Sequence, residues 1–551
     1  TLIPIDPTGR GVTARLESRA QGHWPNWLRH RSPKPAIPGS SPGCPALTAA
    51  DSFRSFWVDS APTSSYPALA ADSDCDVVVI GAGIVGVTAA HRLSSEGARV
   101  TLLEARHIGA GATGYTTGKV SSLNGLVYAR LAEDFGAETA RVYGEANEAG
   151  LATIADLVAQ HGIDCDFRRK PNFTYTESAG GRTALEREVE VARSIDLPAG
   201  LAEGAEELPF PIAAAVRFTD QAEFHALRYL QGLAAAAVSA GCTIHEQTRV
   251  VGVGRGKPCR VATEDGSVVR AGAVIVATHL PILDRGLFFA RTHAERSYAL
   301  LVRLTGDVPQ GMYLSDESSA HSLRAVPTKG GERLLVGGES HKAGHGDPVA
   351  RYEELERWTR ERFEVEAIEH RWATQDHISH DLLPFVGRLW PFGASLLTAT
   401  GFRKWGLAMG TSAAETLAEL ALGRKHAWAD AFDPARLSLR HGLGSFVKEN
   451  ADVGARFVGD RVIKRRRQEE LAPGEGTVVG AGLGQRAVYR DDSGALHSFS
   501  ARCTHLGCIL NFNSAERTWD CPCHGSRFDA TDGGVVEGPA VRPLADADDP
   551  S

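Results

Sequence analysis

The sequence predicts an α/β fold that contains a second, mixed sheet and is followed by a small all-β domain. Three observations predict it. Short apolar runs alternate with helical stretches from about residue 74, strand-rich segments occupy residues 296–340, and short strands with tight turns follow residue 476. Alternation of strands and helices indicates a parallel sheet covered by helices, whereas closely spaced short strands indicate an all-β domain.

The first strand is predicted at Cys75–Ile80, a β-branched run of the kind found in strands buried on both faces. A helix follows to about residue 96, and Gly97 separates it from a second strand at Arg99–Leu103. The same criteria predict a buried strand at 271–277, helices at 138–160, 227–240 and 413–422, and C-terminal strands at 486–490 and 496–500.

The composition is that of an ordinary globular chain. Its 551 residues include 59 basic and 67 acidic side chains, which gives a net charge of −8, and 43% of the residues are hydrophobic. At roughly 150 residues per domain, the length suggests about three or four domain-sized units. The mildly acidic balance argues against a nucleic-acid binder. No apolar run reaches the roughly 18 residues of a membrane helix and no secretory signal is visible. We therefore expect no transmembrane segment and a cytoplasmic location.

A glycine motif, Gly81-Ala-Gly83-Ile-Val-Gly86, directly follows the first predicted strand and opens a helix. The first glycine allows a tight turn, the second lets the backbone approach a pyrophosphate, and the third lets helix and strand pack closely. Glu104 ends the second strand eighteen residues after Gly86, where its carboxylate would accept hydrogen bonds from a ribose diol. A strand, a glycine motif, a helix, a second strand and an acidic residue thus follow one another in order. This order favours a Rossmann-like dinucleotide site over a glycine-rich helix start that binds no nucleotide. We find one such motif, so a separate NAD(P)H domain is not expected.

Several later segments accompany this motif: Gly109–Gly114, Thr116–Val120, Ala273–His279, Leu383–Gly387 and Thr398–Gly406. Over about residues 74–425 they resemble the flavin segments of the glycine/D-amino-acid oxidase (DAO) family. The resemblance implies noncovalently held FAD, with the backbone of Val250 or Val251 at the adenine. The cofactor-binding residues that it implies are Gly81, Gly83, Gly86, Glu104, Gly111, Thr113, Thr117, Val250, Thr278, Gly401 and Gly406.

Cysteine and histidine cluster near the C-terminal end. Nine cysteines are few for a disulfide scaffold of this length, but four of them lie between residues 503 and 523. Cys503-Thr-His505 and Cys521-Pro-Cys-His524 provide two thiolates and two imidazoles, with fifteen residues between His505 and Cys521. Such a set indicates a metal site, and tetrahedral zinc is one candidate.

The wider context of this set, Cys503–Cys508 and Cys521–Ser526 with Gly538–Ala540 further on, resembles the Rieske family, and we favour a [2Fe-2S] cluster over zinc. Neutral imidazole ligands raise the reduction potential above that of an all-cysteine cluster. The resemblance implies that Cys503 and Cys521 ligate one iron, that His505 and His524 ligate the other, and that Cys508 and Cys523 form the disulfide of the cytochrome bc-type branch.

One position departs from the bc-type pattern. Ser526 stands where that branch has a serine whose hydroxyl bonds a cluster sulfide, but Phe528 replaces its usual tyrosine. A lost hydrogen bond to sulfur destabilises the more negative, reduced cluster. We therefore predict a reduction potential below that of the respiratory proteins.

These assignments divide the chain. Residues 1–50 are predicted to be a disordered or artefactual tail because they are rich in proline, residues 51–455 a DAO-like oxidoreductase, residues 456–476 a linker and residues 477–551 a Rieske domain. Within the oxidoreductase, the FAD-binding part is predicted at about 74–170, 220–295 and 371–425, and the substrate part at about 171–219 and 296–370.

A flavin accepts two electrons whereas a Rieske centre accepts one. A chain that holds both can therefore take two electrons from a substrate and release them one at a time. We predict an FAD-dependent dehydrogenase that oxidises a small amine or amino-acid-like substrate. Electrons would leave singly through the exposed histidine edge of the cluster to an external acceptor protein or quinone. Two alternatives stay open: an oxidase that uses oxygen and has a structural cluster, and a noncatalytic redox sensor or electron relay.

The substrate-side residues are less specific. Arg371 precedes the Leu383–Gly387 block, where family members often place carboxylate-binding groups, and an arginine fork suits a carboxylate. Arg371 and Lys404 are the predicted catalytic residues. Further candidates, for each of which a structural role is at least as well supported, are Trp372, Tyr298, Arg324, His341, Lys342 and His377.

Overall fold

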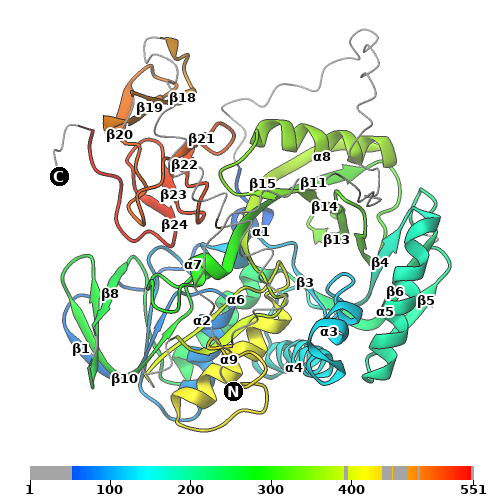
Figure 1. Cartoon of the computed structure of the whole chain (residues 1–551), viewed down its shortest axis with the longest axis horizontal. Coiled ribbons are helices and arrows are strands. Elements are labelled where there is room, and N and C mark those ends of the chain that lie inside the picture. The colour runs from blue at the N-terminus through cyan, green and yellow to red at the C-terminus, as the bar shows by residue number, and fades with distance from the viewer. Residues whose placement is uncertain are drawn as a thin grey trace, which may run out of the picture. The chain divides into compact units, whose positions relative to one another are not determined.

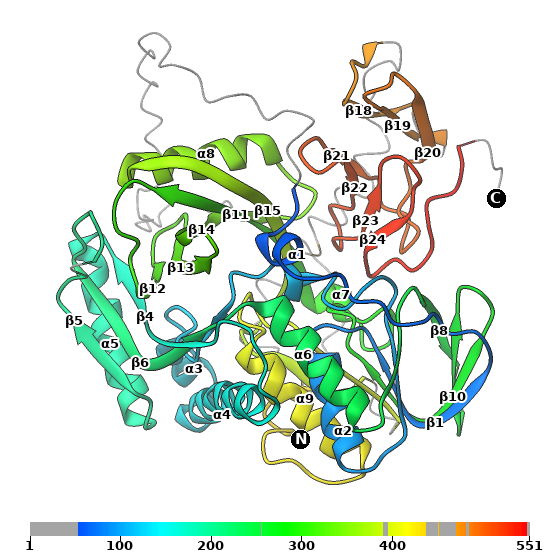
Figure 2. The ribbon, with the colours of Figure 1, turned by 180° about the vertical axis from the view of Figure 1, so that it is seen from behind.

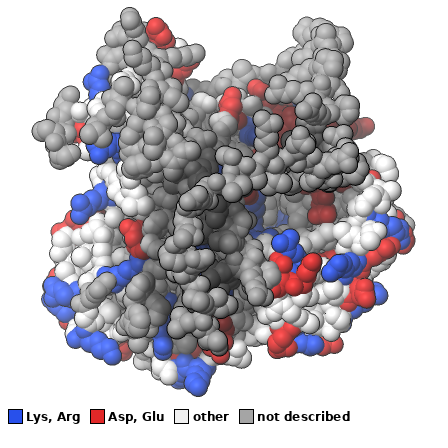
Figure 3. Space-filling view, viewed as in Figure 1, with Lys and Arg blue, Asp and Glu red and all other residues white. Residues whose placement is uncertain are grey.

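The computed structural model describes residues 53–205, 207–254, 256–389, 395–436, 450, 470–480 and 484–547. The predicted tail at 1–50 and most of the predicted linker at 456–476 lie outside these residues. Among the described helices, none is both long and apolar enough to cross a membrane. Acidic and basic side chains are interspersed over the described part of the face in Figure 3.

The first sheet is the predicted parallel sheet. Its strand order is β16-β17-β10-β1-β2-β7, in which β7, β2, β1, β10 and β17 run parallel to one another and the edge strand β16 is antiparallel to β17. An antiparallel pair, β8 and β9, attaches to β10. The strands are β1 (Ser73–Ile80), β2 (Val100–Leu103), β7 (Thr243–His245), β8 (Val250–Gly254), β9 (Cys259–Thr263), β10 (Val268–Val276), β16 (Phe385–Arg388) and β17 (Leu396–Thr400).

Side chains of β1 alternate between two cores. Val77 and Val79 pack with the helices α2, α6 and α9, which lie together in Figure 2, whereas Val78 and Ile80 pack with β8 and β9. This two-residue period follows from the pleat of a strand that is buried on both faces. The helices of this part are α2 (Ile84–Ser95), α3 (Tyr128–Phe135), α4 (Ala137–His161), α6 (Ala226–Ser239) and α9 (Ala408–Ala421).

The helix predicted at 413–422 begins earlier, at Ala408. Gly410 therefore lies inside the helix. A Cβ at Gly410 would lie 3.2 Å from Ile84 and 3.3 Å from Val85, so this glycine lets α9 pack closely against α2. Tertiary packing therefore outweighs the low helix propensity of glycine here.

The second sheet is mixed, as predicted. Its order is β15-β11-β14-β13-β12-β4-β6-β3, with β5 beside β6, and the one parallel pair among these strands is β4 with β12. Helix α8 (Pro348–Arg362) runs along β11, β14 and β15 (Figure 1). The strands are β3 (Lys119–Val120), β4 (Arg168–Thr176), β5 (Ala199–Ala202), β6 (Ala214–Glu223), β11 (Thr292–Leu304), β12 (Met312–Ser315), β13 (Ser322–Thr328), β14 (Gly331–Lys342) and β15 (Val365–Ser379).

The C-terminal domain is all-β, as predicted, with a three-stranded and a four-stranded antiparallel sheet. It has its own core, in which Tyr489, Trp519 and Phe528 are fully or almost fully buried. Its strands are β18 (Gly476–Val479), β19 (Arg486–Arg490), β20 (Leu496–Ser500), β21 (Asn511–Asn513), β22 (Thr518–Asp520), β23 (Arg527–Asp529) and β24 (Val535–Glu537).

Candidate functional site

The glycine motif forms the turn between β1 and α2. Gly81 has a φ of +99°, and a Cβ there would lie 2.6 Å from the carbonyl oxygen of Ala277. Gly86 lies in the first turn of α2, where a Cβ would be 1.9 Å from the carbonyl oxygen of Gly81. Neither position accepts a side chain, so the backbone of α2 packs directly against the turn.

The N-terminus of α2 opens onto a cavity of about 460 Å³, a volume typical of small-molecule and cofactor sites. Gly83 caps the helix without a side-chain hydrogen bond. Glu104, just after β2, lines the same cavity, and its carboxylate accepts from the N–H groups of Ala82 and Arg106, both at 2.8 Å. A helix N-terminus attracts phosphate and a carboxylate suits a ribose diol, so this end of the cavity has the groups that a dinucleotide needs.

Most of the predicted cofactor-binding residues surround this cavity. Two of them, Gly86 and Gly401, do not line it. Gly86 is enclosed within α2, and Gly401 follows β17, where its φ is +79°. The predicted residues that do line the cavity are Gly81, Gly83, Glu104, Gly111, Thr113, Thr117, Val250, Thr278 and Gly406.

The second sheet forms another wall of the cavity. Its contribution is mostly small or polar, which leaves room beside the dinucleotide end for a second molecule. The lining residues from this sheet are Lys119, Ser297, Tyr298, Ala299, Leu314, Ser322, Gly337, Gly338, Ser340, Thr374, Gln375 and Asp376.

The structure separates the two predicted catalytic residues. Lys404 lines the cavity, where its Nζ lies 2.9 Å from Glu295 and donates to the hydroxyl of Ser340 at 2.7 Å. Arg371 lies outside the lining, and its guanidinium donates to Glu356 of α8 at 3.1 Å.

Among the further substrate-side candidates, one lines the cavity. This is Tyr298, whose hydroxyl lies 2.8 Å from Nε2 of His341. Arg324 is buried and donates to the carbonyl of Gly118 at 2.7 Å. The indole of Trp372 likewise bonds a backbone carbonyl, that of Tyr115, at 2.9 Å, which is a structural contact.

Lys119 is a buried cation in the cavity wall that the sequence analysis did not single out. Its Nζ donates to the carbonyl oxygen of Tyr313 at 2.5 Å. Among the described residues, no carboxylate lies within ion-pair distance of it. Burial and, to a smaller extent, the charge of nearby Arg324 lower the pKa of the Lys119 ammonium to about 7, against the opposing effect of the Glu223 carboxylate.

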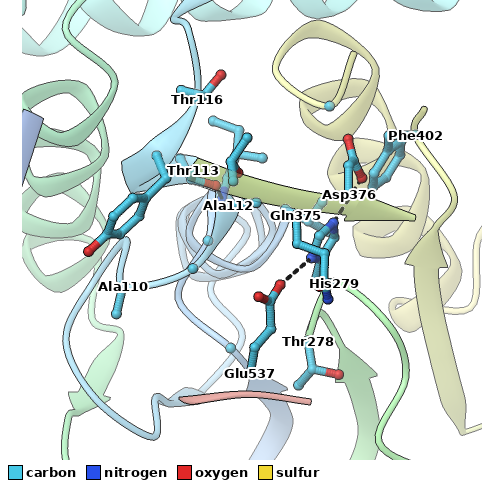
Figure 4. Close-up of a pocket in the computed structure, with 18 of the residues that line it drawn as sticks. Ala110, Ala112, Thr113, Thr116, Thr278, His279, Gln375, Asp376, Phe402 and Glu537 are labelled. Atoms are coloured by element: carbon cyan, nitrogen blue, oxygen red, sulfur yellow. Dashed lines mark hydrogen bonds and ion pairs between the residues drawn. The ribbon is translucent and has the colours of Figure 1, made fainter. Parts of the chain in front are cut away.

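His279, at the end of β10, lies between two carboxylates in the cavity wall (Figure 4). Its Nε2 is 2.9 Å from Asp376 and its Nδ1 is 3.5 Å from Glu537. Burial alone would lower the pKa of His279, but the two carboxylates outweigh it and raise the pKa to about 10. His279 is therefore an imidazolium at neutral pH, and Glu537 comes from the C-terminal domain.

The predicted cluster ligands lie on two loops of the same design. In the loop Cys503–Cys508, the N–H of Cys503 donates to the carbonyl of Cys508, and the N–H of Gly507 donates to the carbonyl of Cys503, both at 2.8 Å. In the loop Cys521–Ser526, the N–H of Cys521 donates to the carbonyl of Ser526 at 2.8 Å, and the N–H of Gly525 donates to the carbonyl of Cys521 at 3.1 Å. Both glycines have a positive φ, near 78°, which such a tight loop requires.

The four predicted ligands converge between these loops. The rings of His505 and His524 lie edge to face with centroids 5.1 Å apart, and the Nδ1 atom of each is buried without a hydrogen-bond partner among the described residues. Cys503 and Cys521 are buried free thiols. Buried imidazole nitrogens without partners are costly unless a metal binds them, so this donor set fits a cluster with two sulfur and two nitrogen ligands.

Cys508 and Cys523 are joined by a disulfide, so the predicted pairing is confirmed. It links the two ligand loops. The hydroxyl of Ser526 is fully buried and accepts from the N–H of Ala540 at 3.1 Å, and Phe528 is fully buried in the domain core.

Comparison with known proteins identifies both parts of the chain. The model of the FAD dependent oxidoreductase family, DAO, matches residues 76–420. This chain belongs to the DAO family of FAD-dependent oxidoreductases. The Rieske [2Fe-2S] domain model matches residues 462–548, so the C-terminal domain is a Rieske domain, which binds a [2Fe-2S] cluster rather than zinc.

One relative shares this arrangement along nearly its whole length. The Rieske 2Fe-2S iron-sulfur protein YhfW of Bacillus subtilis (strain 168) is 35% identical over 505 residues, which cover 91% of this chain and 98% of YhfW. The cytochrome b6-f complex iron-sulfur subunit 2 of Synechocystis is 35% identical over 109 residues, 20% of this chain and 53% of that subunit.

Solved structures resemble the oxidoreductase part. Glycine oxidase from Geobacillus kaustophilus has a TM-score of 0.57 at 20% identity, covering 66% of this chain and 99% of that protein. L-amino acid deaminase from Proteus vulgaris has a TM-score of 0.56 at 16% identity, covering 68% of this chain and all of that protein. At this identity the likeness shows a shared fold.

The Rieske domain of this DAO-family chain docks against the oxidoreductase, which corrects one prediction. The sequence analysis expected an exposed histidine edge, but the side chain of His505 is 6% exposed and His524 is 6% exposed. Phe289 packs against both rings, at 5.4 and 5.0 Å, and Asp284 lies 2.8 Å from Nε2 of His505. Contacts between distant segments cover this edge, and no local pattern reveals them.

Sequence analysis also missed the residues that join the two cofactor sites. Gln375, Asp376 and Glu537 line the cavity, as do further residues of the segment 536–541 from the Rieske domain. The sequence could have indicated His279, because polar residues just after a parallel strand often lie in the crevice where the ligand binds. The Rieske contribution carried none, because it depends on docking.

Proposed function

We propose that this protein is a dehydrogenase that oxidises a small amine or amino-acid-like substrate and passes the electrons through its Rieske cluster to an external one-electron acceptor. When bound, FAD takes up two electrons as a hydride and the cluster takes up one at a time. The acceptor would be a redox protein or a quinone.

The proposed reaction balances as follows. A substrate with a C–H next to nitrogen loses that hydrogen with its two electrons and one proton from nitrogen, and becomes an imine. Water then cleaves the imine to a carbonyl compound and an amine. Two electrons leave through the cluster one after the other, so each substrate reduces two one-electron acceptors, or one quinone, and the two protons pass to solvent or to the quinone.

The observation that carries the proposal is the shared wall of the cavity. Residues 536–538, 540 and 541 of the Rieske domain line the same cavity as the glycine motif and the second sheet. A cluster loop also touches this wall, since the amide of Gln375 donates to the carbonyl of Gly525 at 2.8 Å. Direct contact between the two cofactor sites supports electron transfer between them and argues against a cluster with only a structural role.

The charges of the substrate end favour an anionic group on the substrate. Lys119 lacks a carboxylate partner among the described residues, whereas the charge of Lys404 is balanced by Glu295. Arg371 is engaged by Glu356 outside the cavity. We propose that Lys119, assisted by Lys404, binds the carboxylate of an amino-acid-like substrate, because a buried ammonium with spare donors binds such a group strongly.

A direct test uses the purified protein with both cofactors under anaerobic conditions. A panel of amines and amino acids is added, the visible absorbance of the flavin is followed, and frozen samples are measured by electron paramagnetic resonance. The proposal predicts a substrate that bleaches the flavin and produces the signal of the reduced cluster. Bleaching without that signal would refute it.

The two alternatives predict other outcomes. An oxidase with a structural cluster forms hydrogen peroxide in air, and this activity survives in Cys521→Ser. A sensor or relay shows no flavin bleaching with any substrate of the panel, even when an artificial acceptor is present.

A further inference from the structure

The two iron-ligating histidines have different neighbours in the oxidoreductase domain. His505 contacts Asp284, whose side chain is 55% exposed and which does not line the cavity. The loop of His524 contacts Gln375, which is 2% exposed and does line it. The contact of His505 therefore lies near the protein surface, whereas the loop of His524 contacts the wall of the cavity.

The side chain of Gln375 contacts the cluster loop and also lies in the cavity wall. Its Nε2 donates to the carbonyl oxygen of Gly525, the residue that follows His524, at 2.8 Å. Its Oε1 is buried and has no hydrogen-bond partner among the described residues, although the side chain lies in the cavity wall. A buried amide oxygen without a partner is costly, so this atom is suited to accept an N–H from a molecule in the cavity.

The packing at this point is tight. A Cβ at Gly525 would lie 2.6 Å from the Cβ of Ala294 and 2.7 Å from Nε2 of Gln375. The cluster loop thus approaches β11 and β15 as closely as a glycine permits, and this glycine also closes the loop around the ligand.

We propose that Gln375 is the positioning residue that couples the flavin cavity to the cluster, and that electrons enter the cluster on the His524 side. This inference rests on the proposed function. In each step one electron passes from the reduced flavin to the oxidised cluster, and no atom moves between them. The flavin is oxidised by one electron and one iron is reduced, and the external acceptor reoxidises the cluster before the next step.

The chain offers a matched control for Gln375. Asn511 makes the same kind of contact across the same domain interface, because its side-chain amide donates to the carbonyl of Gly344 at 2.9 Å. Asn511 does not line the cavity. Gln375→Leu and Asn511→Leu therefore each remove one amide-to-carbonyl bond between the domains, but only the first removes a bond next to the cavity.

The test requires no substrate. The protein with both cofactors is illuminated anaerobically with EDTA, which reduces bound flavin, and the delay between flavin bleaching and cluster reduction is measured by absorbance and electron paramagnetic resonance. Gln375→Leu loses the hydrogen bond that holds the cluster loop against the cavity wall, a loss of about 1 kcal/mol, so we expect cluster reduction to slow about fivefold or more. We expect Asn511→Leu to follow the wild type. A failure of the proposed function would instead appear as the absence of any substrate that bleaches the flavin.

Two further measurements keep the test decisive. Gln375→Glu keeps the shape of the side chain but turns a carboxylate oxygen toward the carbonyl of Gly525, so it repeats the experiment if the leucine variant does not fold. Hydrogen exchange of the peptide 521–527 should increase in both Gln375 variants. Equal slowing in Asn511→Leu, or wild-type transfer in both Gln375 variants, would overturn the inference.

Discussion

The four cluster ligands lie on two loops of one small domain, within residues 503–524, whereas the wall of the dinucleotide cavity draws on residues from Ile80 to Val541. Each ligand loop closes with its own backbone hydrogen bonds. The cavity closes only when two sheets and the Rieske domain come together. The cluster site should therefore tolerate substitutions elsewhere in the chain. The cavity should respond to substitutions in the parts of the chain that form its wall.

The largest effect is expected when a cluster ligand is removed. Cys521→Ser deletes one of two thiolate ligands, so we expect complete loss of cluster iron and acid-labile sulfide. FAD should stay bound, because the glycine turn and Glu104, which provide the groups that a dinucleotide needs, belong to the first sheet and not to the Rieske domain. Cys259→Ser, at another buried free cysteine, serves as the control and should keep both cofactors. Loss of FAD together with the cluster would show that the two sites are not separable as the comparison requires.

The next largest effect tests the distributed site. Gly86→Ala places a Cβ 1.9 Å from the carbonyl oxygen of Gly81, so the turn must shift away from α2. Overpacking of this kind costs roughly 1–3 kcal/mol, and we expect much reduced FAD content with a normal cluster signal. Gly204→Ala, where nothing lies within 4 Å of the added atom, should behave as wild type. Normal FAD content in Gly86→Ala would contradict the role given to this turn.

This contrast also explains how much the sequence reveals. The two ligand loops were recognisable because each is a short segment with fixed spacing, and the resemblance to the Rieske family that they carry implied the Cys508–Cys523 disulfide. The strand–glycine–helix unit was predictable for the same reason. Lys119, Gln375 and Glu537 were not, because their roles depend on which strands and domains lie side by side. Arg371 illustrates the limit, since it precedes the Leu383–Gly387 block and was expected at the cavity but pairs with Glu356 instead.

A smaller effect is expected at the substrate end. Lys119→Met removes the buried ammonium, and loss of a charged hydrogen bond of about 1.5–3 kcal/mol predicts a KM about tenfold to a hundredfold higher for an amino-acid substrate. Because the pKa of Lys119 is about 7, the ammonium is present below that pH and is lost as the pH rises through it. Substrate affinity should therefore fall above pH 7 in the wild type and stay flat in the variant. An unchanged KM would exclude Lys119 from carboxylate binding.

The smallest effect tests fine control of the cluster. Phe528→Tyr supplies a hydroxyl in the core of the Rieske domain, where Phe528 is fully buried. One added hydrogen bond to the cluster is worth about 0.5–1.5 kcal/mol, which corresponds to a rise of roughly 20–60 mV for one electron. Redox titration measures the shift, and Ser526→Ala should move the potential in the opposite direction. An unchanged potential in Phe528→Tyr would remove the basis for a low-potential cluster.

The central claim is that electrons from a substrate oxidised at the flavin reach the Rieske cluster of the same chain. It is tested most directly by anaerobic reduction of the purified protein with a panel of amines and amino acids, followed by low-temperature electron paramagnetic resonance. The account predicts that a substrate that bleaches the flavin also reduces the cluster. A bleached flavin beside a cluster that stays oxidised would contradict it.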